Sequence, residues 1–98
     1  MKTITEKEFR QLMNSNEVLV VQFSATWCGP CKSLTKTIEQ NEDKFINPIY
    51  KMDVNVSHHL ANMLRVQSVP TIIRFENTKE VKREVGLQTF EQLQGLTV

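Results

Sequence analysis

Trp27-Cys28-Gly29-Pro30-Cys31 contains both cysteines of this 98-residue chain, separated by two residues. An apolar run, Val18 to Val21, precedes the stretch, and a helical pattern follows it. Thiol–disulfide exchange needs one accessible thiolate and a second thiol close enough to resolve the mixed disulfide. Because positions i and i+3 are neighbours on a helix, the spacing predicts an exposed, reactive dithiol at a helix start.

The start of this helix has the chemistry that such a dithiol needs. We expect Cys28 at or just before the first turn, where unpaired amides and the positive end of the helix dipole favour its thiolate. Cys31 is expected one turn further on, on the same side and deeper. Pro30 is tolerated in a first turn, because the amide proton that it lacks would have no acceptor within the helix. A disulfide across so short a loop stabilises a fold little, which favours a redox role over a structural one.

Composition and charge exclude several classes of protein. Twelve Lys and Arg residues nearly balance eleven Asp and Glu residues, so no charge bias indicates binding to nucleic acid or to a membrane. The N-terminal residues, 1–6, lack the apolar core of a signal peptide, and the longest apolar run has only four residues. We therefore expect one cytoplasmic domain over residues 1–98, in a compartment where paired cysteines are more often catalytic or metal-binding than structural.

The hydrophobic pattern predicts the order of the elements. Strands are expected at 17–24, 49–54, 72–75 and 80–85, and helices at 6–14, at about 28–44, after Ser57 and after Thr89. Thr5 and Thr89 each begin a capping box, and Ser57 is the expected N-cap of the short third helix. This order predicts an α/β fold, with a mixed central sheet that has a parallel core and a C-terminal antiparallel hairpin, flanked by helices on both faces.

Residues 27–32, after a Val-rich strand, closely resemble the active site of the thioredoxin family, a reading that CxxC near a βαβ pattern supports. The resemblance extends over nearly the whole chain. Val69-Pro70-Thr71 falls where the family has its cis-proline loop, Lys51 where it often has a lysine near the buried site, and Gly86 where a glycine follows the last strand. The resemblance implies the thioredoxin fold and a monomeric thiol–disulfide oxidoreductase that reduces protein disulfides.

The resemblance also implies roles for individual residues. Cys28 would be the attacking nucleophile and Cys31 the resolving thiol, and their redox-active disulfide would serve in place of a bound cofactor. Electrons would come from a thioredoxin reductase. Pro70 would be cis, which places the Val69 backbone beside the dithiol to pair with an extended substrate segment. The implied substrate-binding residues are Trp27, Gly29, Pro30, Val69 and Pro70.

Three residues depart from the family pattern. Gln22 stands where the family has a buried aspartate that accepts the proton of the resolving cysteine, and a neutral amide is no base at physiological pH. We therefore expect slow resolution by Cys31, with Gln22 and Lys51 as residues that modulate it. Ser24 replaces a second tryptophan, which predicts a more open pocket, and Lys36 replaces the proline that usually kinks the active-site helix.

Other interpretations of the dithiol remain open. The pair is half of a zinc site if further ligands approach it, and His58 and His59 are the only other strong candidates, although neighbouring helical residues diverge too widely to chelate together. A metal-bridged dimer is a related possibility. A binding module that holds a partner protein through the Trp27 and Val69 surface, with redox activity secondary, is the main alternative to an enzyme.

Overall fold

The computed structural model describes residues 1–98. The strands are β1 (Val18–Ser24), β2 (Ile49–Asp53), β3 (Thr71–Glu76) and β4 (Lys79–Val85). The helices are α1 (Glu6–Ser15), α2 (Gly29–Glu39), α3 (His58–Met63) and α4 (Phe90–Thr97), with a 3₁₀ turn, η1, at Glu42–Lys44. None of these helices combines the length and the apolar character that crossing a membrane requires.

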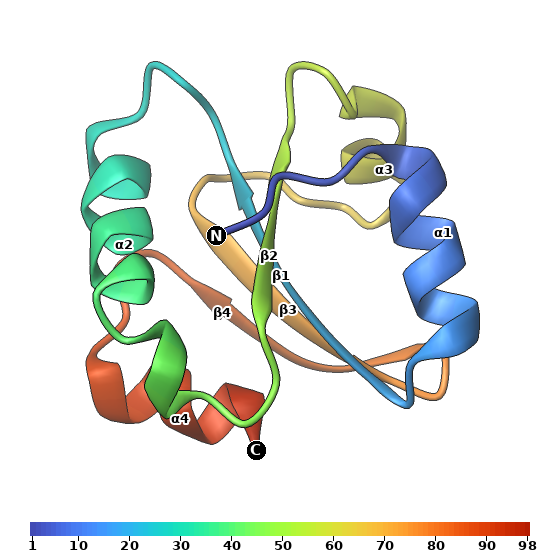
Figure 1. Ribbon diagram of the computed structural model, residues 1–98. Coiled ribbons are helices and arrows are strands. Elements are labelled where there is room, and N and C mark those ends of the chain that lie inside the picture. Colours follow the sequence, from blue (N-terminus) through green and yellow to red (C-terminus); the bar gives the residue numbers. More distant parts are fainter.

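The four strands form one mixed sheet in the order β2-β1-β3-β4. β1 runs parallel to β2, and the pairs β1–β3 and β3–β4 are antiparallel. Figure 1 shows α2 and α4 on one face of this sheet and α1 and α3 on the other. The predicted mixed sheet with helices on both faces is therefore confirmed.

The parallel part of the sheet is limited to β1 and β2, because α3 is too short to carry the chain back along the sheet. Six helical residues span about 9 Å, whereas the five residues of β2 span about 17 Å. The chain therefore enters β3 from the end of the sheet at which β2 finishes, and β3 runs antiparallel to β1.

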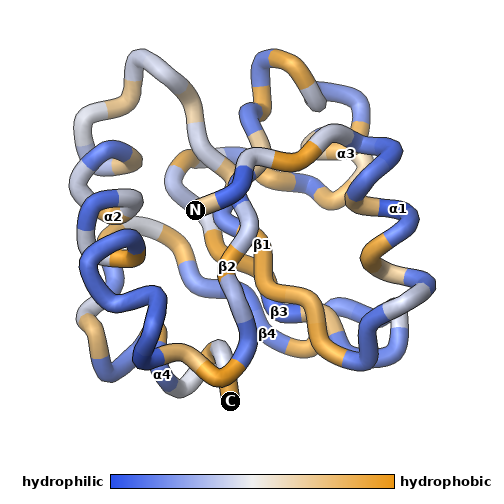
Figure 2. Tube along the Cα trace, viewed as in Figure 1, coloured by the Kyte–Doolittle hydropathy of each residue, from blue (hydrophilic) through white to orange (hydrophobic).

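Strand β1 is buried on both faces, as its continuous apolar run predicts. Leu19, Val21 and Phe23 belong to the cluster that includes residues of α1 and α3. Val20 belongs to the opposite cluster, formed with α2 and α4. Figure 2 shows the hydrophobic strands inside and hydrophilic segments on the outer helices. Because side chains alternate along a strand, Gln22 lies on the Val20 face, directly under α2.

The two predicted capping boxes are confirmed at Thr5 and Thr89, whose side chains accept from the third amide of each helix. Ser57 is the N-cap residue of α3, as predicted, but its side chain makes no capping hydrogen bond. Instead, the Leu60 amide of α3 donates to the Glu6 carboxylate of α1 at 3.1 Å. A carboxylate from α1 therefore makes the hydrogen bond that was expected of the Ser57 hydroxyl. No local sequence pattern indicates this contact.

Helix α2 ends at Glu39, earlier than the predicted end near residue 44. The Asn41 amide bonds the carbonyl of Ile38, three residues back, and the Asn41 side chain donates to the carbonyl of Thr37 at 2.8 Å. The Asn41 side chain thereby takes the carbonyl that its own backbone amide would bind in a continuing α-helix. The chain tightens into the 3₁₀ turn that follows.

Candidate functional site

Cys28 is the N-cap residue of α2, with extended backbone angles of φ −94° and ψ 111°. Its Sγ accepts a hydrogen bond from the backbone amide of Cys31 at 3.2 Å. Pro30 lies within the first turn, where it removes no helical hydrogen bond. The sulfur of Cys28 therefore occupies the place of a capping oxygen, at the positive end of the helix.

The two thiols are buried, so the expectation of an exposed dithiol is wrong. Only 5% of Cys28 and 2% of Cys31 is exposed. Ala25 packs with both cysteines, and Val54 and Val69 lie against them from the neighbouring loops. The spacing of the cysteines predicts their separation but carries no information on loops that are distant in sequence.

Burial also changes the acidity of Cys31. Loss of solvent around its sulfur, followed by its hydrogen bond with the Cys28 side chain, raises the pKa of the Cys31 thiol to about 11. A thiol with that pKa is almost entirely protonated at neutral pH. Cys31 must therefore lose a proton before it can act as a nucleophile.

The loop before β3 lies beside the dithiol. The Val69–Pro70 peptide bond is cis, in agreement with the family resemblance. The Cys28 thiol donates to the carbonyl of Val69, with 3.7 Å between sulfur and oxygen. On the other side of the loop, the Gly86 amide donates to the carbonyl of Pro70 at 2.8 Å. Gly86 has a φ of +89°, a conformation that side chains disfavour, so a glycine suits this contact.

An apolar hollow lies beside Cys28 on the outer surface. Trp27 is 71% exposed, and it lines a hollow of about 340 Å³ together with Val54, Val66 and Val69. Gly29 and Pro30 are exposed at the start of α2. The five residues predicted to bind substrate therefore lie close to one another around the cysteines, except that Pro70 is buried rather than at the surface.

Gln22 lies under α2 and is completely buried. Its Nε2 donates to the carbonyl of Cys31 at 3.3 Å and to Oγ1 of Thr35 at 3.1 Å. Lys51 is the partner of Gln22 in the β1–β2 register. Sequence reasoning missed Thr35, although its position four residues after Cys31 places it on the same face of the helix.

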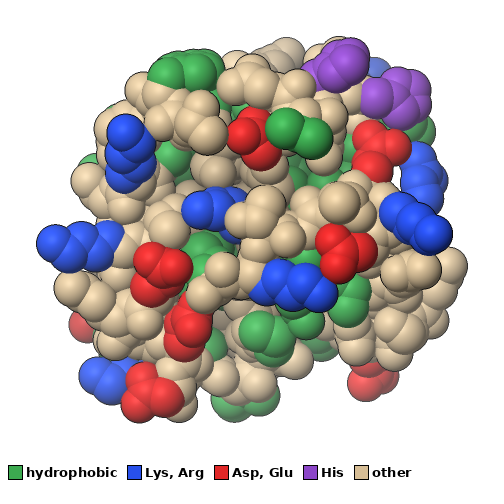
Figure 3. Space-filling model, turned by 45° about the horizontal axis from the view of Figure 1, so that its top comes forward, with side chains coloured by type: hydrophobic (Ala, Val, Ile, Leu, Met, Phe, Trp, Pro, Cys, Tyr) green, Lys and Arg blue, Asp and Glu red, His purple; other side chains and the backbone are tan.

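A second hollow, of about 460 Å³, lies on the Cys31 side of α2. Cys31, Thr35, Lys51 and Ser24 all line it. Figure 3 brings forward the end of the molecule at which β1 and β2 finish, and shows positive and negative side chains interspersed there without an area of single sign.

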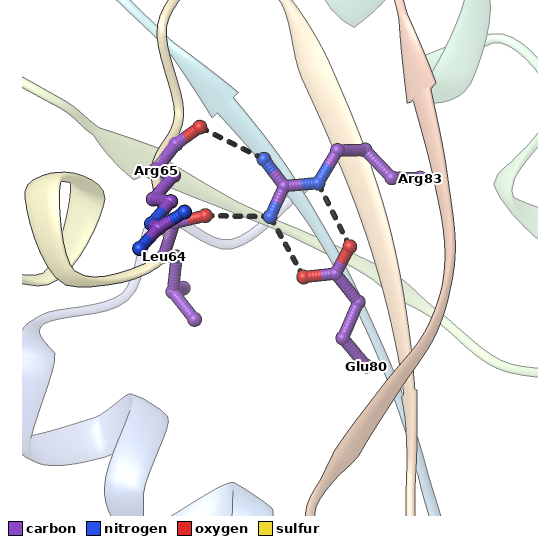
Figure 4. A network of polar contacts seen from close by, with 4 residues as sticks. All are labelled: Leu64, Arg65, Glu80 and Arg83. Carbon is purple, nitrogen blue, oxygen red and sulfur yellow. Dashed lines mark hydrogen bonds and ion pairs between the residues drawn. The ribbon is translucent and has the colours of Figure 1, made fainter.

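Arg83 of β4 holds the segment that leads into the Val69–Pro70 loop (Figure 4). Its guanidinium donates to the carbonyls of Leu64, at 2.6 Å, and Arg65, at 3.0 Å. The same group forms a two-bond pair with Glu80, at 2.7 and 2.8 Å, and this pair lowers the pKa of the Glu80 carboxyl. The sequence pattern indicates neither contact, because a backbone carbonyl that accepts a distant side chain leaves no local signal.

The structure brings together no group of three or more His, Cys, Asp or Glu side chains that could hold a metal ion. His58 and His59 lie at the start of α3 and are exposed, outside the cluster that contains the cysteines. The available donors near the dithiol are therefore the two thiols themselves.

Comparison with known proteins independently identifies the family that this chain resembles. The family model described as thioredoxin matches residues 1–97. A thioredoxin of Mycoplasmoides gallisepticum is 36% identical over 98 residues, which cover 98% of each chain. A Mycobacterium leprae protein named bifunctional thioredoxin reductase/thioredoxin is 38% identical over 80 residues, which are 80% of this chain and 18% of that protein. Among solved structures, a mutant thioredoxin of Halobacterium salinarum superposes with a TM-score of 0.88 at 30% identity, covering 98% of this chain and 86% of that one.

Proposed function

The chain belongs to the thioredoxin family and is a thiol–disulfide oxidoreductase, and from this premise we propose that it reduces disulfides of other proteins through Cys28 and Cys31. The observation that carries the proposal is the position of Cys28, whose sulfur receives the Cys31 amide at the N-terminus of α2. That position stabilises negative charge on sulfur. We assign the nucleophile to Cys28 and the resolving thiol to Cys31.

The proposed cycle transfers two electrons to the substrate. The Cys28 thiolate attacks one sulfur of the substrate disulfide, forming a mixed disulfide and releasing the other substrate sulfur as a thiolate. Cys31 then loses its proton and attacks the Cys28 sulfur. This second step forms the Cys28–Cys31 disulfide and releases the remaining substrate sulfur. The redox group is the cysteine pair itself, so the cycle uses no bound cofactor.

We propose that the substrate segment lies across the hollow beside Cys28. Trp27 and Val69 supply apolar contact area, Gly29 and Pro30 leave the start of α2 open, and Pro70 fixes the direction of the Val69 backbone. An extended segment that paired with the Val69 backbone would have its disulfide next to the Cys28 sulfur, because that sulfur lies 3.7 Å from the Val69 carbonyl.

Gln22 is proposed to make the second step slow. Its amide is tied to Thr35 and to the Cys31 carbonyl, and as a neutral group it accepts no proton at physiological pH. Lys51, which lines the hollow beside Cys31, is proposed to modulate the step by placing a positive charge near the forming thiolate.

The oxidised protein must be returned to the dithiol by a reductant. The name of the Mycobacterium leprae relative joins a thioredoxin reductase to a thioredoxin, and this supports a thioredoxin reductase as the electron source here. We place the cycle in the cytoplasm, because a dithiol that is repeatedly re-reduced works in a reducing compartment.

Reduction of a protein disulfide by dithiothreitol, with and without the protein, tests the proposal. The wild-type chain should accelerate the reaction, and Cys28→Ser should reduce the rate to that of dithiothreitol alone. Acceleration that survives Cys28→Ser would overturn the assignment. If instead a variant with Ser at both cysteine positions still binds a partner protein and supports that partner's activity in full, the chain acts as a binding module and not as an enzyme.

A further inference from the structure

The hollow beside Cys31 contains a carboxylate, that of Asp53, to which the family comparison assigns no role. It is bounded by α2, the ends of β1 and β2, and Thr3 of the N-terminal segment. Its volume of about 460 Å³ is enough for several water molecules, each of which takes about 30 Å³ in the liquid. Cys31 and Asp53 both line this hollow.

The opening of this hollow follows from the small side chain at position 24. Ser24 lines it at the end of β1, where the family resemblance places a tryptophan. In the β1–β2 register Ser24 is the direct partner of Asp53, and neighbouring strands lie about 4.8 Å apart. Asp53 therefore lies on the strand next to Ser24, the residue that leads into the active-site loop.

Five charged side chains face the hollow besides the thiol: Lys32, Lys36, Glu39, Lys51 and Asp53. The three lysine side chains are hydrogen-bond donors and offer no acceptor for a proton. Glu39 lies eight residues after Cys31, about 12 Å along the helix axis, and it pairs with the N-terminal amine at 3.7 Å. Asp53 is the remaining base, and its Oδ1 accepts only the amide of Asn55, at 2.8 Å.

We propose that Asp53 accepts, through water in this hollow, the proton that Cys31 loses when it attacks the mixed disulfide. The inference rests on the proposed function and specifies its second step. The Cys31 S–H bond breaks, its proton passes through water to the Asp53 carboxylate, and the Cys31 sulfur forms a bond to the Cys28 sulfur. The substrate sulfur leaves with the electron pair of the broken disulfide. Asp53 is half-buried, so it returns the proton to solvent.

The requirement for an acceptor follows from the acidity of Cys31. Burial raises the pKa of its thiol, so the thiolate is scarce at neutral pH. In the sheet under α2, the Gln22 amide is neutral and already hydrogen-bonded. A proton therefore leaves more readily toward the hollow than toward the sheet.

Stopped-flow reduction of 5,5′-dithiobis(2-nitrobenzoate) separates the two steps, because each releases one coloured thiolate. Asp53→Asn keeps the oxygen that accepts from Asn55, and it should slow the second release at pH 7 at least about tenfold with the first release unchanged. Glu39→Gln removes a carboxylate from the same hollow and should change neither release. Adding Gln22→Asp to Asp53→Asn should restore a fast second release.

The pH profile of the second release provides a further readout. In Asp53→Asn the rate should rise about tenfold per pH unit up to the pKa of Cys31, whereas in the wild type it should rise less steeply. An unchanged second release in Asp53→Asn, or an equal loss in Glu39→Gln, would overturn the inference. Failure of the proposed function gives a different result: the first coloured thiolate would still be released in Cys28→Ser.

Discussion

Gln22 is the residue whose departure from the family pattern we expect to have the largest consequence. It is completely buried, hydrogen-bonded to Thr35 and to the Cys31 carbonyl, and lies under the resolving thiol. A buried amide with its hydrogen bonds satisfied stabilises the core, but it offers no base to the thiol above it. The same side chain therefore favours stability, and we propose that it disfavours rapid resolution.

Replacing Gln22 by Asp should accelerate the second step and lower stability. A carboxylate under α2 would accept the Cys31 proton directly, and we expect the mixed disulfide to resolve at least about tenfold faster. Burying a charge at a completely enclosed position should lower the free energy of unfolding, measured in urea.

Gln22→Asn is the matched control, since its side chain has the length of Asp without the charge. It should leave the lifetime of the mixed disulfide close to the wild-type value. Equal lifetimes in Gln22→Asp and Gln22→Asn would contradict a role for the missing base.

At the scale of elements, Arg83 connects the edge strand β4 to the loop that contacts the dithiol. It binds the Leu64 and Arg65 carbonyls at the end of α3, six and five residues before Pro70. Orphan carbonyls at a helix end need such donors. Glu80 holds the guanidinium in place with two bonds, as Figure 4 shows. The segment that leads into the Val69–Pro70 loop is therefore held in place from β4.

Arg83→Ala should loosen this loop. Loss of the hydrogen bonds to Leu64 and Arg65 should lower the free energy of unfolding by about 1–2 kcal/mol. It should also raise KM for a protein disulfide while leaving attack on a small aromatic disulfide unchanged, because only an extended segment uses the Val69 backbone.

Lys82→Ala, on the same strand, is the control. Its ammonium is largely exposed and makes only a 3.8 Å pair with Glu84, and such pairs contribute little to stability. An equal rise in KM in both variants would show that charge on β4, rather than the position of the loop, governs substrate binding.

The elements also show what the sequence can predict. Periodicity and capping boxes identify each helix and strand, because these signals lie within a few residues of one another. Two features depend on contacts between distant segments and leave no local pattern: Glu6 capping α3, and Val54 and Val69 burying the cysteines. Asn41 ends α2 through a local bond to the Thr37 carbonyl, which the hydrophobic period does not indicate. The motif identifies Cys28 and Cys31 as the dithiol, whereas Thr35 and the hollow beside Cys31 appear only once α2, β1 and β2 are in place.

At the scale of the whole molecule, the sheet has two edges that are each protected. Residues 2–4 pair with Lys51 of β2 through two backbone hydrogen bonds, at 2.8 and 2.9 Å. The other edge strand, β4, carries charges of both signs in the segment from Lys79 to Glu84. Charged edge strands disfavour pairing between molecules, which supports the proposal that the protein is a monomer presenting a single dithiol to its partners.

The proposed cycle requires that substrate be bound covalently through Cys28 and released by Cys31. The most direct measurement is mass-spectrometric mapping of the covalent complex that forms when Cys31→Ser is mixed with a disulfide-bonded protein. We expect a stable complex linked through Cys28, and none with Cys28→Ser, in which the remaining Cys31 is buried and protonated. A complex of equal yield linked through Cys31 in Cys28→Ser would contradict the assigned roles.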